Sequence, residues 1–116
     1  MKKVDRFWYQ VNFQESISIQ VTPSINLGDL YTANLDGTTL EKPPNGRYAF
    51  LAIRPITKKH FFLIEFSFAG AQEGAEYILE INGDTAGNSG PFKVRVKRND
   101  SMLLKTFVFE MVQEPV

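Results

Sequence analysis

Apolar and polar residues alternate along most of this chain, which is the pattern of β-strands whose two faces have different surroundings. Strand-length runs that alternate or are continuously apolar cover residues 7–13, 17–21, 48–53, 61–68, 75–81, 92–96 and 103–112. Turn-forming residues separate several of these runs, as in Asn82-Gly83-Asp84. No run is a convincing helix, so the pattern predicts an all-β fold.

Short strands joined by turns favour a single antiparallel β-sandwich of about seven strands, immunoglobulin-like in size, with a small barrel as the alternative. The 116 residues suit one domain, which would cover residues 1–116. Ten phenylalanines and a hydrophobic content of 43% supply a core between two sheets. The likeness is one of architecture only, because the cysteine-tryptophan-cysteine pattern of immunoglobulin domains is absent.

Two of the predicted strands are apolar on both faces. In the run 61–68, Phe62, Ile64 and Phe66 share one face, while Phe61 and Leu63 make part of the other face apolar. The run 103–112 has the same two-sided character. Such strands belong at the centre of a sheet with both faces covered, either by loops or by another subunit. We therefore expect the protein to be more than a monomer.

The segment from Pro23 to Arg47 has the weakest pattern and holds most of the candidate binding residues. Its turn residues predict a loop over a sheet end, with a short strand or helical turn near residues 30–35, rather than a core strand pair. Hydrogen-bonding groups beside an aromatic ring suit a polar ligand or a partner's backbone. With Trp8 from the first strand, the candidate ligand-binding residues are Trp8, Asp29, Tyr31, Asn34 and Asp36. Alternatively, the leucines of this segment pack into the core of the sandwich, and the polar side chains of the segment face water.

No combination of residues predicts catalysis or a metal site. The chain has no cysteine and one histidine, His60, which follows two lysines and is expected to be structural or solvent-exposed. Carboxylates on the predicted strands could pair across a sheet, as in a small hydrolase, although a solvated face is the simpler interpretation. We therefore expect no enzyme, no cofactor and no metal.

Charge and hydropathy narrow the range of partners. Thirteen basic residues balance thirteen acidic ones, which argues against a dedicated nucleic-acid binder. Lys93, Arg95 and Lys97 form a basic stripe, for which protection of an edge strand is favoured over anion binding. Residues 4–6 place charge where a signal peptide needs an apolar segment, and no run is long enough to span a bilayer. The sequence does not indicate the cellular compartment of the protein.

These observations predict a non-catalytic module for protein–protein interaction or assembly, whose partner is another protein or a second copy of the chain. The alternative is a carbohydrate-binding accessory module in which Trp8, Tyr9 or Tyr31 stacks on sugar rings. A small hydrolase with a carboxylate pair is the third and weakest hypothesis.

Overall fold

The structure is a computed structural model that describes residues 1–24, 30–53, 59–69, 73–83, 91–98 and 104–111. Within these ranges the chain forms strands and no helix, which confirms the all-β prediction. The strands are β1 (Lys2–Asp5), β2 (Trp8–Val11), β3 (Ser16–Pro23), β4 (Tyr31–Leu35), β5 (Thr38–Leu40), β6 (Arg47–Leu51), β7 (Lys59–Phe66), β8 (Glu76–Gly83), β9 (Phe92–Lys97) and β10 (Leu104–Met111). The described ranges contain no helix long and apolar enough to cross a membrane.

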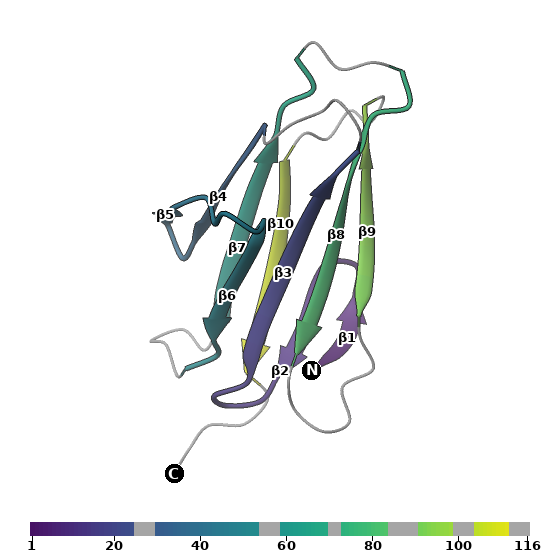
Figure 1. Ribbon diagram of the computed structural model, residues 1–116. Helices are drawn as coiled ribbons and strands as arrows, with labels where there is room; N and C mark the ends of the chain where they lie inside the picture. Colours follow the sequence, from purple (N-terminus) through teal and green to yellow (C-terminus); the bar gives the residue numbers. More distant parts are fainter. Residues whose placement is uncertain (25–29, 54–58, 70–72, 84–90, 99–103, 112–116) are drawn as a thin grey trace.

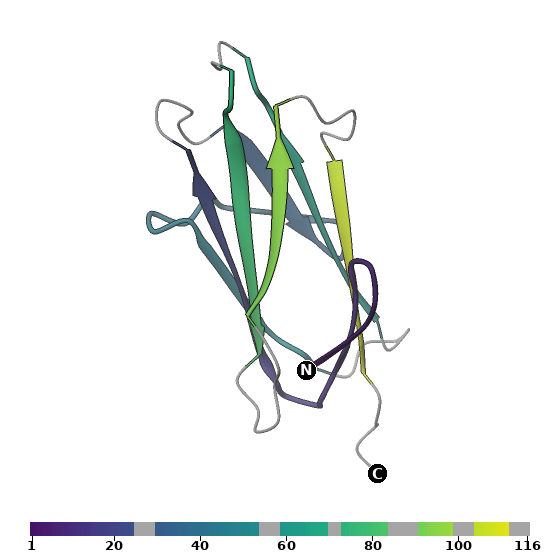
Figure 2. The same ribbon diagram turned by 90° about the vertical axis from the view of Figure 1, so that its right-hand side faces the viewer.

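The strands form two sheets that pack face to face as a β-sandwich (Figure 1). The six-stranded sheet, called sheet A here, has the order β1-β2-β10-β7-β4-β5, and the four-stranded sheet B has the order β6-β3-β8-β9. Figure 2 views the sandwich from its edge, with sheet B on the left and sheet A on the right. Both sheets end in open edge strands, so the fold is a sandwich and the small-barrel alternative is wrong.

Neighbouring strands are antiparallel with one exception. β2 and β10 run parallel, with Trp8 beside Val108 and Val11 beside Met111. β2 and β3 follow each other in the sequence but lie in different sheets. Sheet A is therefore assembled from the two ends of the described chain together with its middle.

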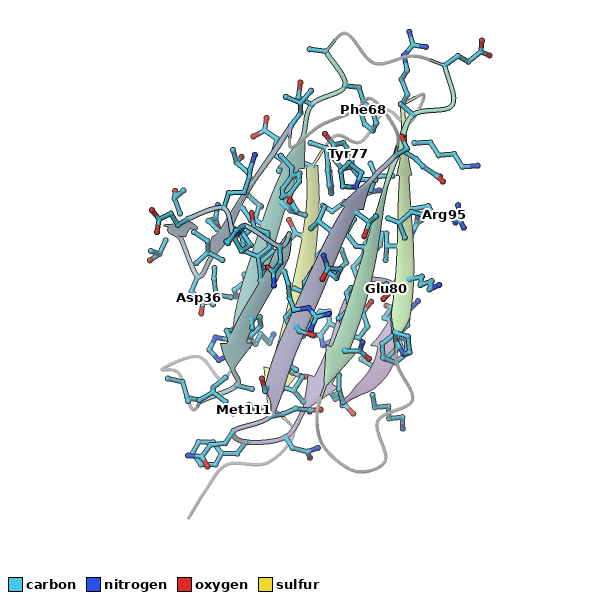
Figure 3. All side chains as sticks on the ribbon, in the orientation of Figure 1. Asp36, Phe68, Tyr77, Glu80, Arg95 and Met111 are labelled. Atoms are coloured by element: carbon cyan, nitrogen blue, oxygen red, sulfur yellow. The ribbon has the colours of Figure 1, made fainter. Side chains whose placement is uncertain are left out.

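The core lies between the two sheets and is largely aromatic. Inward-facing residues alternate with outward-facing ones on every long strand, and on β7 the burial is strictly periodic. The rings of Tyr9 and Phe109 stack with centroids 5.4 Å apart. Figure 3 shows Tyr77 and Phe68 together at one end of the sandwich, where their ring centroids are 5.3 Å apart. The many aromatic residues thus fill the space between two apolar sheet faces.

The runs of residues predicted as strands correspond to β2, β3, β6, β7, β8, β9 and β10. The predicted number of about seven strands is too low, because β1, β4 and β5 bring the number among the described residues to ten. All four residues of β1 are exposed, so this strand has no alternation of apolar and polar positions by which the sequence could reveal it.

The prediction of a loop over residues 23–47 is wrong in its main point. β4 and β5 form a hairpin, and β4 also pairs with β7 inside sheet A. Asp36 and Gly37 connect the two strands with φ angles of 52° and 84°, and positive φ at both central residues is the signature of a tight hairpin turn. Tyr31 and Ala33 are buried in the core. Part of the segment is therefore a core strand. Of the expectations for this segment, only the short strand near residues 30–35 is confirmed.

Candidate interaction surface

The outer face of sheet A carries a contiguous apolar surface, which we call the sheet A patch; it consists of Trp8, Phe61, Leu63, Leu104 and Val108. Val108 pairs with Trp8 on one side and with Phe61 on the other, so these three side chains form one row across β2, β10 and β7. Phe61 and Leu104 are each 43% exposed, and the other members are half-buried. Side chains opposite each other on paired strands are close enough to touch, so the row is continuous.

Charged and polar side chains surround this patch. The ammonium of Lys59 lies 3.6 Å from a carboxylate oxygen of Glu110 and 4.9 Å from the centroid of the Trp8 ring. Glu65 is exposed at the opposite end of the same outer face of β7. Asn34, next to Leu63 on β4, extends the polar border. An apolar centre with a polar rim is the usual anatomy of a protein interface.

The outer face of sheet B has the opposite character. Arg47 donates from Nε to Oε1 of Gln20 at 3.0 Å, and Lys93 lies 3.5 Å from Glu80. Figure 3 shows Glu80 on this face, on β8, beside the edge strand β9 that carries Arg95. Two large apolar side chains, Leu51 and Ile78, also lie on this face, but each pairs with a polar residue of β3, so they form no apolar row.

The predicted basic stripe lies on β9, which is the edge strand of sheet B. Arg95 contacts Oε1 of Glu76 at 2.8 Å, so it and Lys93 each have a carboxylate partner on the neighbouring strand β8. The location supports the interpretation that the stripe protects a sheet edge from pairing with another chain. Because these positive charges are balanced locally, they give little attraction for an anionic partner.

The residues predicted as a ligand site do not come together. Trp8 belongs to the sheet A patch, whereas Tyr31 is only 3% exposed and points into the core. Asn34 projects from the opposite face of β4, Asp36 lies in the β4–β5 turn (labelled in Figure 3), and Asp29 lies outside the described residues. Tyr31 therefore cannot offer a ring face to a sugar, and the same correction applies to Tyr9, which is fully buried.

Asp36 and His60 make a contact that the sequence did not reveal. One carboxylate oxygen of Asp36 lies 2.7 Å from Nδ1 of His60, and the other accepts the Phe61 amide hydrogen at 2.8 Å. Nε2 of the same ring lies 3.0 Å from the carbonyl oxygen of Ile53, and the histidine is 5% exposed. These contacts fix the β4–β5 turn against β7, which agrees with a structural role for His60. The turn pair Asp36-Gly37 was visible in the sequence, but nothing there connects it to a histidine 24 residues away.

Other buried polar side chains also have partners within the fold. Glu15 is fully buried and accepts hydrogen bonds from the Met1 amino group at 2.9 Å and from the Asn12 amide at 3.0 Å. Lys105 is 5% exposed, and its ammonium lies 5.2 Å from the centroid of the Phe7 ring. These groups therefore have partners inside the sandwich and present no reactive atom at the surface.

The carboxylates considered for a hydrolase are divided between the two sheets. Glu76 and Glu80 lie on β8 in sheet B with basic partners, while Glu65 and Glu110 lie on different strands of sheet A. Glu65 pairs across the sheet with Leu104, and Glu110 with Lys59, so these two acids do not face each other. Among the described residues, no group of three or more histidines and acidic residues is placed to hold a metal ion.

Comparison with known proteins identifies no relative from which a function could be transferred. No protein-family model, no curated protein and no solved structure matches the chain. A functional interpretation therefore depends on the chemistry of its own surfaces, of which the sheet A patch is the most distinctive.

Proposed function

We propose that this protein is a non-catalytic binding module that associates with another protein chain through the sheet A patch. The observation that supports the proposal is the unbroken apolar row of Trp8, Val108 and Phe61 on the outer face of the larger sheet. Contiguous exposed apolar surface with a polar rim is typical of interaction sites on otherwise polar domains. These side chains are already partly buried in the monomer, so a partner would contribute about 25 cal/mol for each Å² of the apolar area that is still exposed.

The position of the patch also indicates the mode of association. β7 and β10 are interior strands with a paired neighbour on each side, so their backbone hydrogen bonds are already made within sheet A. A partner would therefore pack against side chains rather than add a strand to an open edge. Two sheets packed in this way lie about 10 Å apart with their strands roughly aligned.

A carbohydrate-binding role has less support. Of the three aromatic rings considered for stacking, only Trp8 lies at the surface, because Tyr9 and Tyr31 are in the core. The Lys59 ammonium already lies 4.9 Å from the Trp8 ring centroid, where it would compete with a sugar. Val108, the neighbour of Trp8 across the sheet, provides no hydrogen-bonding group in its side chain for sugar hydroxyls.

Site-specific photo-crosslinking tests the proposal. A benzophenone amino acid at position 61 would probe the sheet A patch, and the same residue at Ser18, on the outer face of sheet B, is the matched control. We expect protein adducts in source cells from position 61 and few or none from position 18. Equal labelling at both positions, or none at position 61 in a folded protein, would contradict the proposal. A glycan whose binding is abolished by Trp8→Ala would favour the carbohydrate alternative instead.

A further inference from the structure

We propose that the partner of the sheet A patch is a second copy of this chain, packed face to face so that β7 of one copy lies antiparallel across β7 of the other. This inference rests on the proposed function, because it uses the same surface. It adds the identity of the partner and the geometry of the complex. Both follow from the order of the side chains on β7.

The outward-facing residues of β7 are self-complementary when the strand is reversed. In chain order they are Lys59, Phe61, Leu63 and Glu65, which reads positive, apolar, apolar, negative. In an antiparallel arrangement Lys59 faces Glu65 of the second copy, and Phe61 faces Leu63. A twofold axis repeats every contact, so two ion pairs would enclose an apolar centre. The Lys59 ammonium lies 3.6 Å from Glu110 of its own chain, so in the complex it would lie between that carboxylate and Glu65 of the second copy.

The neighbouring strand is compatible with the same axis. On β10 the outward residues Val108 and Thr106 would face each other across the interface. Leu104 would lie opposite Glu110 of the second copy, whose carboxylate keeps its ion pair with its own Lys59. Face-to-face contact therefore covers the exposed leucine without leaving the glutamate uncompensated.

The arrangement described so far has its twofold axis perpendicular to the strands. A face-to-face dimer with the axis parallel to the strands fits less well. It would place β10 of one copy over β7 of the other, so that Glu110 faces Lys59 but Leu104 faces Glu65, because these residues pair in register. The Glu65 carboxylate would then be desolvated against an apolar side chain, and a buried unpaired charge is costly. The axis across the strands instead pairs each Glu65 with a lysine.

The outer face of sheet B does not offer an equivalent surface. The outward residues of its central strand β8 include Glu76 and Glu80, which are already paired with Arg95 and Lys93 of β9. Packing this face against a copy of itself would desolvate those ion pairs and gain little apolar burial. The charge pattern therefore assigns self-association to sheet A alone.

A charge-swap experiment tests the inference. Sedimentation velocity over a concentration series would compare the wild-type protein with Glu65→Lys, Lys59→Glu and the double variant. We expect a dimer for the wild type and at least roughly tenfold weaker association for each single variant, because like charges across an interface oppose binding. The double variant should recover part of the association, since Lys59→Glu also removes the ion pair of Glu110. Glu80→Lys, an equivalent reversal on sheet B, should leave dimerisation unchanged.

Thermal unfolding of each variant confirms that it is folded, and Phe61→Lys provides a second way to disrupt the interface. A wild-type monomer at all concentrations would overturn the inference, as would a dimer that is insensitive to both single reversals or is not even partly restored by the double variant. A monomer that still gives crosslinks from position 61 to a different protein would refute self-association and leave the proposed function intact. Absence of both dimer and crosslinks would refute both.

Discussion

The strands β7 and β8, each in the interior of its sheet, have the same length and an alternately buried inner face, but their outer faces differ. The outward positions of β8 carry two glutamates that pair with basic residues of β9. The outward positions of β7 carry Phe61 and Leu63 between two charged ends. The outer face of sheet B is therefore mainly polar, with its exposed Leu51 at an edge strand, whereas sheet A leaves apolar area exposed at its centre. An alternating pattern identifies a strand, but the chemistry of the outward positions indicates whether that strand needs a partner.

The sharpest test of this difference uses adjacent phenylalanines on β7. Phe62 is fully buried and Phe61 is 43% exposed on the other face. We expect Phe62→Ala to lower the free energy of unfolding by about 3–5 kcal/mol, because it leaves a cavity in the core. Phe61→Ala should cost less than about 1 kcal/mol in stability but should weaken association.

Urea denaturation at low protein concentration measures the stability loss of each variant without a contribution from assembly. A similar loss of stability for Phe61→Ala and Phe62→Ala would show that the outer face of sheet A is covered within the monomer.

The next comparison concerns neighbouring residues of β2, Tyr9 inside and Trp8 outside. Burial raises the pKa of Tyr9 to about 12 from 10.0, and its hydroxyl has no hydrogen-bond partner among the described residues. The folded state therefore favours the neutral phenol. The free energy of unfolding is unaffected below pH 10 and falls as the pH rises from 10 towards 12, because Tyr9 ionises more readily in the unfolded chain. The loss amounts to roughly 2–3 kcal/mol.

Tyr9→Phe removes the unpaired hydroxyl and keeps the ring, so the variant should be at least as stable as wild type at neutral pH and less sensitive to alkaline pH. Chemical denaturation at a series of pH values measures both quantities. The matched variant Trp8→Phe, on the outer face, should keep the wild-type alkaline response. An unchanged alkaline slope in Tyr9→Phe would contradict the burial of this phenol.

The smallest effects are expected on the outer face of sheet B. Glu80 and Lys93 are 3.5 Å apart, and their side chains are 40% and 60% exposed. Exposed pairs of this kind contribute about 0.2–1 kcal/mol, and salt weakens them. A double-mutant cycle with Glu80→Gln and Lys93→Gln should give a coupling energy in this range that decreases at high salt. A coupling energy well above it would mean that this face is less accessible to water than its exposure indicates.

The sequence predicted the all-β class because alternation depends only on local side-chain order. It predicted the two-sided apolar strands, and therefore Phe61 and Leu63, for the same reason. It failed for the hairpin of β4 and β5, whose burial is decided by pairing with β7 rather than by its own composition. A short strand without long alternation becomes recognisable only when its neighbour is known.

The candidate surface was predictable in its parts but not in its arrangement. Trp8 and Phe61 could each be identified as aromatic, but only the register that places Val108 between them turns them into one surface. Strand register is a long-range property, determined by pairing among segments far apart in the chain. The Asp36 and His60 contact is hidden for the same reason, since it joins a turn to a strand from another part of the sequence.

The parallel pairing of β2 with β10 has a consequence for how the protein is made. β2 is synthesised well before β10, so its parallel neighbour is not available until residues 104–111 have been made. During that interval one side of β2 and one side of β7 have no strand beside them, and unpaired edges of apolar strands are prone to aggregation. Sheet A can therefore be completed only after β10 has been synthesised, because β10 is the strand that joins β1 and β2 to β7, β4 and β5.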